Sequence, residues 1–309
     1  MLRCPITYEP IEIGRYSKSG LHQISKKLDD LSVLPYSIEE FNKEYIKRAG
    51  KLSIQGVQPK LSMKLNTPAQ KFELVDKNGK YILKPQNDNY PELPQNEDLT
   101  MKMAKICNIE TPWHGLIWAK NNQLCYVIKR FDRVGHKSKL ALEDFAQLSQ
   151  KTRVTKYNSS MENVVSIIDS YTTFPILEKI KLFRIIIFNF LIGNEDMHLK
   201  NFSLITRNKK VELSPAYDLL NTTIAIKDPI EEIALPIAGK KRNLKKKHFI
   251  QYLAEDRMKI PIIKISSILS EIYEGIKEMK NYISISFLSN EMKKKYLALL
   301  QKKIRVIYG

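Results

Sequence analysis

The stretch NEDMHLKNF at residues 194–202 decides the fold, because it places Asp196 five positions before Asn201. A second acidic signal, AYDLL, brings Asp218 seventeen positions after Asn201. In protein kinases an aspartate accepts the proton of the substrate hydroxyl, and an asparagine five positions on and a later aspartate hold Mg²⁺. Amide and carboxylate oxygens are the hard ligands that this ion prefers. The order predicts phosphoryl transfer, although the Asp-x4-Asn spacing alone is a weak signal.

Composition sets broad limits on the class of protein. The 309 residues are 43% hydrophobic, which is enough for two lobes with a core in each. The net charge of +18 favours binding to polyanions such as nucleotides, nucleic acid or an acidic protein, but a lysine-rich surface also keeps a protein soluble. Cys4, Cys107 and Cys125 have no metal-ligand spacing and are expected to be structural. The most apolar run, residues 185–192, is too short to cross a bilayer, so we expect a soluble, cytoplasmic protein.

The periodicity of apolar residues changes along the chain. Helical spacing predicts helices at residues 21–34 and 37–50, the second with a Ser37 cap and Glu40 three positions later. A further helix is expected at 96–107. Short alternating runs predict antiparallel strands, with KNGK at 77–80 as a hairpin signal. These strand runs are residues 53–65, 71–75, 81–84, 114–120 and 123–131.

After about residue 135 helical periods dominate. The expected helices are residues 161–171, 175–193, 246–256, 262–280 and 290–307. The sequence therefore predicts an α+β fold of two lobes, with a small β-rich N-terminal lobe over residues 1–132 and a larger all-helical C-terminal lobe over residues 133–309.

Three residues of the expected β-rich lobe fit a phosphate-binding site, two of them as contacts to phosphate and the third as a partner of Lys84. Gly56, in a turn, would let the backbone approach phosphate oxygens, although a turn glycine is common and there is no G-x-G-x-x-G loop. Lys84 ends a strand where a kinase places the lysine that contacts the phosphates, although most strand lysines face solvent. Glu97 could pair with Lys84 or simply suit the dipole of the helix that it begins.

Seven blocks in this order resemble the HipA family of bacterial serine/threonine kinase toxins, over about residues 50–250. The blocks are SIQGVQPKLSMKL (53–65), YILKPQ (81–86), QNEDLTMKMAKICNIETP (95–112), YVIKRFDR (126–133), LEDFAQLSQ (142–150), FLIGNEDMHLKNFSLI (190–205) and LSPAYDLLNT (213–222). The resemblance implies a bilobal protein-kinase-like fold. The opening CPITYEP and the lack of an extra β-domain before residue 50 look most like the short form, the HipT toxin of three-part HipBST modules, in which a small partner supplies the missing N-terminal subdomain.

The resemblance implies a role for each matching residue. Asp196 would be the catalytic base, and Asn201 and Asp218 would hold Mg²⁺. His198 and Lys200 would contact the nucleotide phosphates or stabilise the loop. The second role is open for His198 because a lone histidine often only satisfies a backbone carbonyl.

Nucleotide binding is expected to draw on several segments. The implied residues are Gln55, Gly56, Val57, Gln58, Lys60, Lys84, Lys129, Arg130, Phe131, Asp132, His198, Lys200 and Tyr217. Residues 55–60 would form a lid over the phosphates, and residues 129–131 would be the hinge whose backbone reads adenine. This family often has a glutamate where Lys129 stands, so a side-chain bond to adenine from this position is in doubt. Tyr217 would flank the nucleotide, and Asp132 would reach the ribose.

The resemblance also implies regulation at Ser53. The matching serine is autophosphorylated in the family, which expels the lid, and a phosphate would be repelled by ATP while Lys51 and Lys60 could hold it elsewhere. An ordinary turn serine is the alternative. Residues 133–140 stand where a kinase presents its activation or substrate segment.

Two further segments have structural and functional alternatives. In LEDFAQLSQ, we expect Glu143, Asp144 and Gln147 to brace the catalytic loop rather than to perform chemistry. The basic run GKKRNLKKKHF, at residues 239–249, reads as a solvated loop and helix start, with contact to nucleic acid as the alternative.

Two classes of function compete at this point. The first is an ATP- and Mg²⁺-dependent protein kinase, the toxin of a toxin–antitoxin module with a HipB-like DNA-binding antitoxin and a HipS-like small partner. Its implied substrate is an aminoacyl-tRNA synthetase, with tryptophanyl-tRNA synthetase favoured. The second is a catalytically weak binding module that works through the antitoxin. Retention of Lys84, Asp196, Asn201 and Asp218 favours the kinase. A small-molecule kinase of the aminoglycoside phosphotransferase kind is disfavoured by the paired IKRFDR and LEDFAQ blocks.

Overall fold

The chain forms two compact units in the computed structural model, which describes residues 2–48, 59–87, 89–135, 138–226 and 229–309. Unit 1 is made of residues 1–99, 112–137 and 285–288, and unit 2 of residues 100–111, 138–284 and 289–309. The sequence predicts one boundary at residue 132. Contacts place the division near residue 137 and group residues 100–111 with unit 2.

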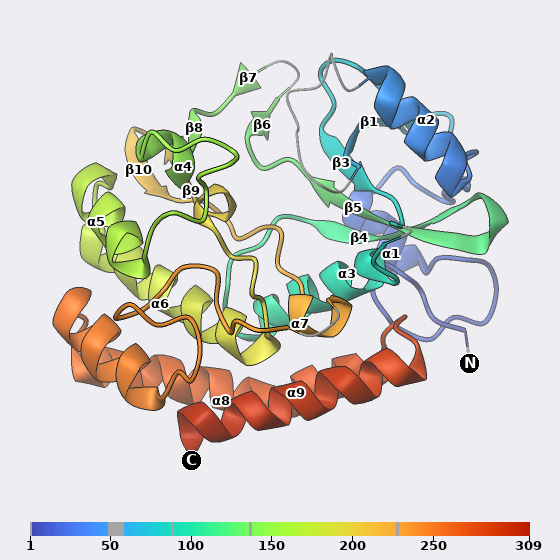
Figure 1. Cartoon of the computed structure of the whole chain (residues 1–309). Coiled ribbons are helices and arrows are strands. Elements are labelled where there is room, and N and C mark those ends of the chain that lie inside the picture. Colours follow the sequence, from blue (N-terminus) through green and yellow to red (C-terminus); the bar gives the residue numbers. More distant parts are fainter. Residues whose placement is uncertain (1, 49–58, 88, 136–137, 227–228) are drawn as a thin grey trace. The chain divides into compact units, whose positions relative to one another are not determined.

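Unit 1 is built on a five-stranded antiparallel sheet in the order β2-β1-β3-β5-β4 (Figure 1). Its strands are β1 Leu61–Asn66, β2 Lys71–Leu74, β3 Tyr81–Lys84, β4 His114–Ala119 and β5 Gln123–Lys129. The β5 strand lies between β3 and β4, and its run LCYVI is buried on both faces, which explains why it reads as continuously apolar rather than alternating. These strands confirm the antiparallel runs expected within residues 71–131.

The KNGK segment at 77–80 is not a hairpin, contrary to its sequence signal. Strands β2 and β3 both pair with β1, where Met63 lies opposite Leu74 on one side and Tyr81 on the other. The turn therefore joins strands on opposite sides of β1. Glycine is needed there because a Cβ on Gly79 would lie 1.9 Å from Oγ of Ser62.

The first helix of unit 1 is shorter than its apolar spacing suggests. Helix α1 spans Lys18–Ile24 and ends at Ser25, whose backbone is extended at φ −161° and ψ 134°. Leu28, Leu31 and Leu34 are buried all the same, so the i, i+3 spacing beyond Ile24 reflects core packing of turns, not a helix. Helix α2 spans Ile38–Arg48 and has the expected cap. The Ser37 amide donates to Oε2 of Glu40 at 2.7 Å, and the Glu40 amide donates to Oγ of Ser37 at 3.3 Å.

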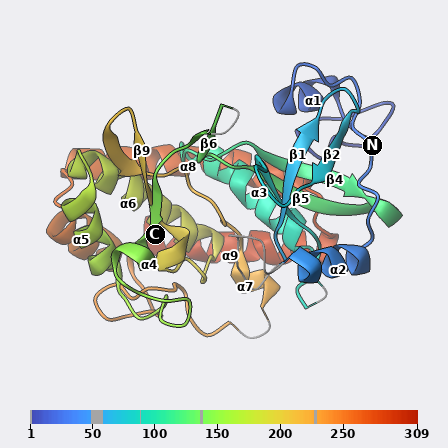
Figure 2. The same ribbon diagram turned by 90° about the horizontal axis from the view of Figure 1, so that it is seen from above.

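Unit 2 is organised around one helix that is apolar on nearly all sides. Helix α6, Pro175–Ile192, contains the run at 185–192, and α5, α9 and β10 pack on it. The two last helices, α8 and α9, are labelled in Figures 1 and 2, and they meet where the Tyr308 hydroxyl donates to the Leu269 carbonyl at 2.9 Å. The other helices with described residues in unit 2 are the end of α3 (Leu93–Ile106), α4 Phe145–Leu148, α5 Met161–Tyr171, α7 Thr222–Ala225, α8 Ile262–Ile285 and α9 Asn290–Tyr308. Among the described residues, no helix is both long enough and apolar enough to cross a bilayer.

The prediction of an all-helical C-terminal lobe is wrong. Unit 2 contains a three-stranded sheet in the order β10-β9-β8, formed by β8 Leu142–Asp144, β9 Ser203–Arg207 and β10 Lys210–Leu213. Strands β9 and β10 are joined by Asn208 and Lys209, both at positive φ. A two-residue turn of this kind usually contains glycine, so its sequence signal is weak.

The remaining short elements lie mostly in loops. They are the 3₁₀ turn η1 Lys120–Asn122, strands β6 Arg133–Val134 and β7 Ser138–Lys139, the 3₁₀ turn η2 Leu199–Asn201 and the π-helix η3 His248–Arg257. The π-helix replaces the α-helix expected at 246–256. Lys245, Lys246 and Lys247 are exposed just before it, as a solvated basic loop requires.

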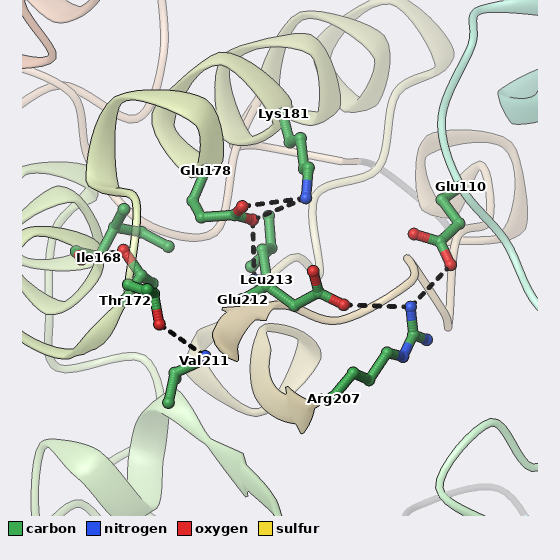
Figure 3. A network of polar contacts seen from close by, with 10 residues as sticks. Glu110, Ile168, Thr172, Glu178, Lys181, Arg207, Val211, Glu212 and Leu213 are labelled. Atoms are coloured by element: carbon green, nitrogen blue, oxygen red, sulfur yellow. Dashed lines mark hydrogen bonds and ion pairs between the residues drawn. The ribbon is translucent and has the colours of Figure 1, made fainter. Parts of the chain in front are cut away.

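A polar network fixes the β9–β10 hairpin (Figure 3). The amide of Leu213 donates to Oε2 of Glu178, on α6, at 2.9 Å, and Lys181 lies 3.0 Å from the same carboxylate. Arg207 binds Glu212 at 3.3 Å and Glu110 at 3.1 Å. The hairpin leads directly into Tyr217 and Asp218, so this network helps to place both residues.

Candidate active site

Lys84 and Glu97 form a buried ion pair in unit 1. Nζ of Lys84 lies 2.5 Å from Oε1 of Glu97, and the residues are 3% and 2% exposed. Lys84 pairs with Tyr126 across β3 and β5, and its Nζ lies 5.5 Å from the centre of the Tyr126 ring. Helix α3 begins at Leu93, so Glu97 stands in its second turn, where the helix dipole acts weakly. The pairing suggested by the sequence is therefore confirmed.

The expected lid falls largely outside the described residues. This holds for Gln55, Gly56, Val57 and Gln58, and also for the proposed autophosphorylation site, Ser53. Lys60 is described and half-buried, just before β1.

In the segment expected to read adenine, residues 129–131, two backbone amides already donate hydrogen bonds within unit 1. The amide of Lys129 donates to the Trp113 carbonyl at 2.8 Å, and the amide of Arg130 donates to the Lys80 carbonyl at 2.8 Å. The Arg130 carbonyl in turn accepts the Arg133 amide at 3.4 Å, and the reading of adenine by this segment stays a prediction. The side chain of Lys129 is exposed.

Asp132 is the centre of a small charge cluster that includes arginines on both sides. Arg130 binds its carboxylate in a bidentate manner, at 3.0 and 2.9 Å, and Nε of Arg133 lies 3.3 Å away. The residue is 8% exposed. This arrangement holds residues 130–133 in one conformation, and contact of Asp132 with a ribose stays a prediction. Phe131, expected in the same segment, is half-buried.

In unit 2, the loop that carries Asp196 starts from a fixed point. Helix α6 ends at Gly193, which has a left-handed backbone at φ 71° and ψ 41°. A Cβ there would lie 2.4 Å from Cδ2 of Leu299 and 2.7 Å from Oγ1 of Thr223. The Gly193 carbonyl also accepts the hydroxyls of Thr222, at 3.2 Å, and Thr223, at 2.9 Å. Glycine is therefore required, and the loop begins in a defined direction.

The loop brings Asp196 and Asn201 together. Nδ2 of Asn201 donates to the Asp196 carbonyl at 3.2 Å, and the Asn201 amide donates to the His198 carbonyl at 2.9 Å. The Asp196 amide in turn donates to Oδ1 of Asn194 at 3.1 Å. With its Nδ2 committed, Asn201 has Oδ1 as the atom that suits a cation.

His198 is 5% exposed within this loop. Burial lowers its pKa, and the carboxylates of Asp196 and Asp218 act in the opposite direction. Within the part of the chain that the structure describes, Nδ1 of His198 has no hydrogen-bond partner. A buried ring nitrogen in this state suits a ligand, which favours the functional role for His198.

Lys200 and Tyr217 brace the loop. Nζ of Lys200 lies 2.8 Å from Oδ2 of Asp144, and Asp144 caps α4 through a reciprocal pair of bonds with Gln147 at 2.8 and 2.9 Å. The Tyr217 hydroxyl donates to the Lys200 carbonyl at 2.9 Å and lies 2.6 Å from Oγ of Ser203. Of the residues expected to brace the loop backbone, Asp144 contacts the loop through the Lys200 side chain, and Gln147 contacts Asp144. Tyr217 has a contact with the loop backbone that the sequence did not indicate.

Glu143 takes no such part. It is exposed on β8, opposite Leu204 of β9.

Asp218 has an unusual backbone at φ +54°. Aspartate enters this region more readily than most residues, yet the conformation is sparsely populated and is often found at functional sites. The preceding residues hold it in place, because the Ala216 amide donates to the Glu110 carbonyl at 2.8 Å and the Ser214 amide donates to the Ser203 carbonyl at 2.8 Å.

The donor set fits Mg²⁺ bound together with a nucleotide. The described residues contain no group of three histidine, cysteine or acidic side chains that could hold a metal by themselves. Mg²⁺ does not need such a cage, since it is usually held by one or two protein oxygens together with phosphates and water. Oδ1 of Asn201 and the Asp218 carboxylate are oxygens of this kind.

Sequence reasoning missed Tyr157, whose hydroxyl donates a hydrogen bond to Oδ1 of Asp196. Tyr157 stands in the polar, turn-rich stretch KTRVTKYNSS at 151–160, and the two residues are 39 positions apart. No periodicity or spacing signals such a contact. The three cysteines are buried, as expected.

Comparison with known proteins identifies relatives in both sequence and structure. The chain is 30% identical over 236 residues to a putative kinase of Haemophilus influenzae, covering 71% of this chain and 68% of that protein. It is 27% identical over 207 residues to the serine/threonine-protein kinase toxin HipA of Shewanella oneidensis, covering 60% of this chain and 47% of the toxin. The chain thus spans about half the length of that toxin.

Two solved structures share the fold. HipA of Shewanella oneidensis, in a complex with HipB and its operator DNA, has a TM-score of 0.69 at 20% identity, covering 91% of this chain and 73% of that one. The Helicobacter pylori proinflammatory kinase CtkA has a TM-score of 0.60 at 17% identity, covering 83% and 92%. These likenesses show an α+β, kinase-like fold. The model of the HipA-like C-terminal domain matches residues 52–280, and the chain therefore belongs to this family.

Proposed function

We propose that the chain is an ATP- and Mg²⁺-dependent serine/threonine protein kinase. The observation that carries the proposal is the loop of unit 2, in which the side chain of Asn201 is tied to the backbone of Asp196, and Tyr217, the neighbour of Asp218, donates a hydrogen bond to the Lys200 carbonyl of the same loop. A protein that only binds a partner has no need of this set together with the buried pair of Lys84 and Glu97.

The residues divide the chemistry among them. Asp196 accepts the proton of the acceptor hydroxyl while that oxygen bonds to the γ-phosphorus of ATP and the bond to ADP breaks. Lys84 contacts the phosphates, and its position is fixed by Glu97. Asn201 and Asp218 would hold Mg²⁺, which neutralises phosphate charge. His198 and Lys200 contact phosphate or maintain the loop.

The proposed substrate and partners rest on the resemblance to the family. We propose that the chain is the toxin of a toxin–antitoxin module, with a HipB-like DNA-binding antitoxin and a HipS-like small partner as in the HipT subtype. The support is that HipA of Shewanella oneidensis was solved with HipB and its operator DNA. An aminoacyl-tRNA synthetase, with tryptophanyl-tRNA synthetase favoured, is the proposed substrate, and autophosphorylation at Ser53 the proposed regulation.

Labelled phosphate transfer tests the kinase directly. The protein is incubated with γ-labelled ATP, Mg²⁺ and a bacterial lysate, and a labelled protein band is expected. Asp196→Asn and Asp218→Asn should each lower the labelling about a hundredfold or more. Asp256→Asn, which removes an exposed carboxylate in the same unit, is the matched control and should label like the wild type. Equal labelling by wild type and Asp196→Asn, or no labelled band at all, would favour the binding module instead.

A further inference from the structure

Tyr157 joins the loop that carries Asp196 to a separate segment of unit 2. Its hydroxyl donates a hydrogen bond to Oδ1 of Asp196. Asn194 and Asn201 hold the amide and the carbonyl of Asp196, so both act on its backbone. Tyr157 acts on the carboxylate, which is the group that the proposed reaction uses.

The phenol is held in place by the loop itself. The edge of the Tyr157 ring packs against the buried ring of His198, with centroids 5.0 Å apart and planes at 81°. The carbonyl of the preceding residue, Lys156, accepts the amide of Leu199 at 3.4 Å. On the other side, the Asn158 amide donates to the Thr155 carbonyl at 2.9 Å and closes a turn. Backbone and side chain thus fix the position of the hydroxyl.

A fixed phenol changes what the carboxylate can do. An aspartate side chain rotates about two bonds, and a base is effective only when its accepting oxygen faces the acceptor hydroxyl. The bond from Tyr157 occupies Oδ1 and so leaves Oδ2 as the oxygen that takes the proton. A hydrogen bond to a charged acceptor is also among the stronger ones, so it restrains rotation well.

We propose that Tyr157 is a positioning residue for phosphoryl transfer, which orients the carboxylate of Asp196 through its hydroxyl. The proposal rests on the kinase function proposed above. It requires no chemical change at Tyr157, since the phenol keeps its proton throughout.

The test is Tyr157→Phe, which keeps the ring against His198 and removes only the hydroxyl. Initial rates of label transfer from ATP are measured over a range of ATP concentrations with the full chain. We expect kcat to fall about tenfold while KM for ATP changes less than about twofold, because the base is misoriented and the nucleotide site is intact. Tyr273→Phe is the matched control, since Tyr273 is 56% exposed on α8, and should match the wild type.

A second comparison shows whether Tyr157 acts through Asp196. In an Asp196→Asn background, Tyr157→Phe should cause no further loss of rate, because residues that act as a unit are not additive. Unchanged kcat in Tyr157→Phe would overturn the proposal, and so would a raised kcat, which would mean that the phenol blocks the base. A wild-type protein without transfer activity would instead overturn the kinase function, so the two failures are distinguishable.

Discussion

Removing the charge of Glu97 is expected to destabilise unit 1 strongly. Glu97→Gln leaves the ammonium of Lys84, 3% exposed, without the carboxylate that lies 2.5 Å from it. Breaking a buried ion pair by removing one partner costs about 3 kcal/mol or more, because the other charge stays buried. Since both residues are almost fully buried, solvent screening reduces this value little. The double variant Lys84→Met, Glu97→Gln removes the buried ammonium as well and should recover more than half of the loss.

Tryptophan fluorescence can follow this unit by itself during urea unfolding. The chain has two tryptophans, Trp113 and Trp118, and both belong to unit 1. Glu12→Gln, which neutralises an exposed carboxylate of the same unit, is the control and should change the free energy of unfolding by less than about 0.5 kcal/mol. The prediction is contradicted if Glu97→Gln lowers the free energy of unfolding no more than Glu12→Gln does. It is also contradicted if the double variant is no more stable than Glu97→Gln.

Two pH dependences are expected in unit 2. A hydrogen bond from Ser267, together with an ion pair to Arg184 at 2.7 Å, lowers the pKa of Glu271 to about 2 from 4.5, so its stabilisation is complete above pH 4.5 and is lost as the pH falls toward 2. The melting temperature of Glu271→Gln should therefore fall less over this range than that of the wild type. Equal slopes of melting temperature against pH would contradict the pairing. Burial lowers the pKa of His248 below 6.5, and its Nδ1 accepts the Lys245 amide at 2.9 Å, so stability is complete above pH 6.5 and declines below it. His248→Asn keeps a hydrogen-bond acceptor at this position and should make the melting temperature less dependent on pH between about pH 7.5 and 5.5. An unchanged pH dependence would assign the loss of stability to other groups.

Much of the fold could be predicted because strong local signals agree with the tertiary structure. Strand β5 has 7 residues, whereas the apolar spacing of helix α6 continues over 18 residues, and this length is enough to distinguish a buried strand from a buried helix. The cap at Ser37 was visible from the three-residue spacing to Glu40. The pair of Lys84 and Glu97 followed from a strand and a helix that are consecutive in the chain.

The errors share a physical cause, because each concerns contacts between distant segments. The small sheet of unit 2 pairs β8 with β9, about sixty residues later, and neither is long enough to show alternation. The leucines after Ile24 have helical spacing but are buried in turns. In the site, Tyr157 meets Asp196 only through the fold, and the same holds for the contact between Tyr217 and Lys200. The loop could thus be proposed as a site from sequence, whereas most of the contacts that support it could not be predicted.

The crowding at Gly193 has a consequence for the last helix of the chain. Leu299, on α9, leaves no room for even one additional carbon at the residue from which the loop with Asp196 departs. A helix more than a hundred positions downstream thereby sets the direction of the chain into the proposed base. Substitutions on this side of α9 would then alter phosphorylation rates without touching nucleotide or substrate, and screens for inactive variants should recover them far from the chemistry.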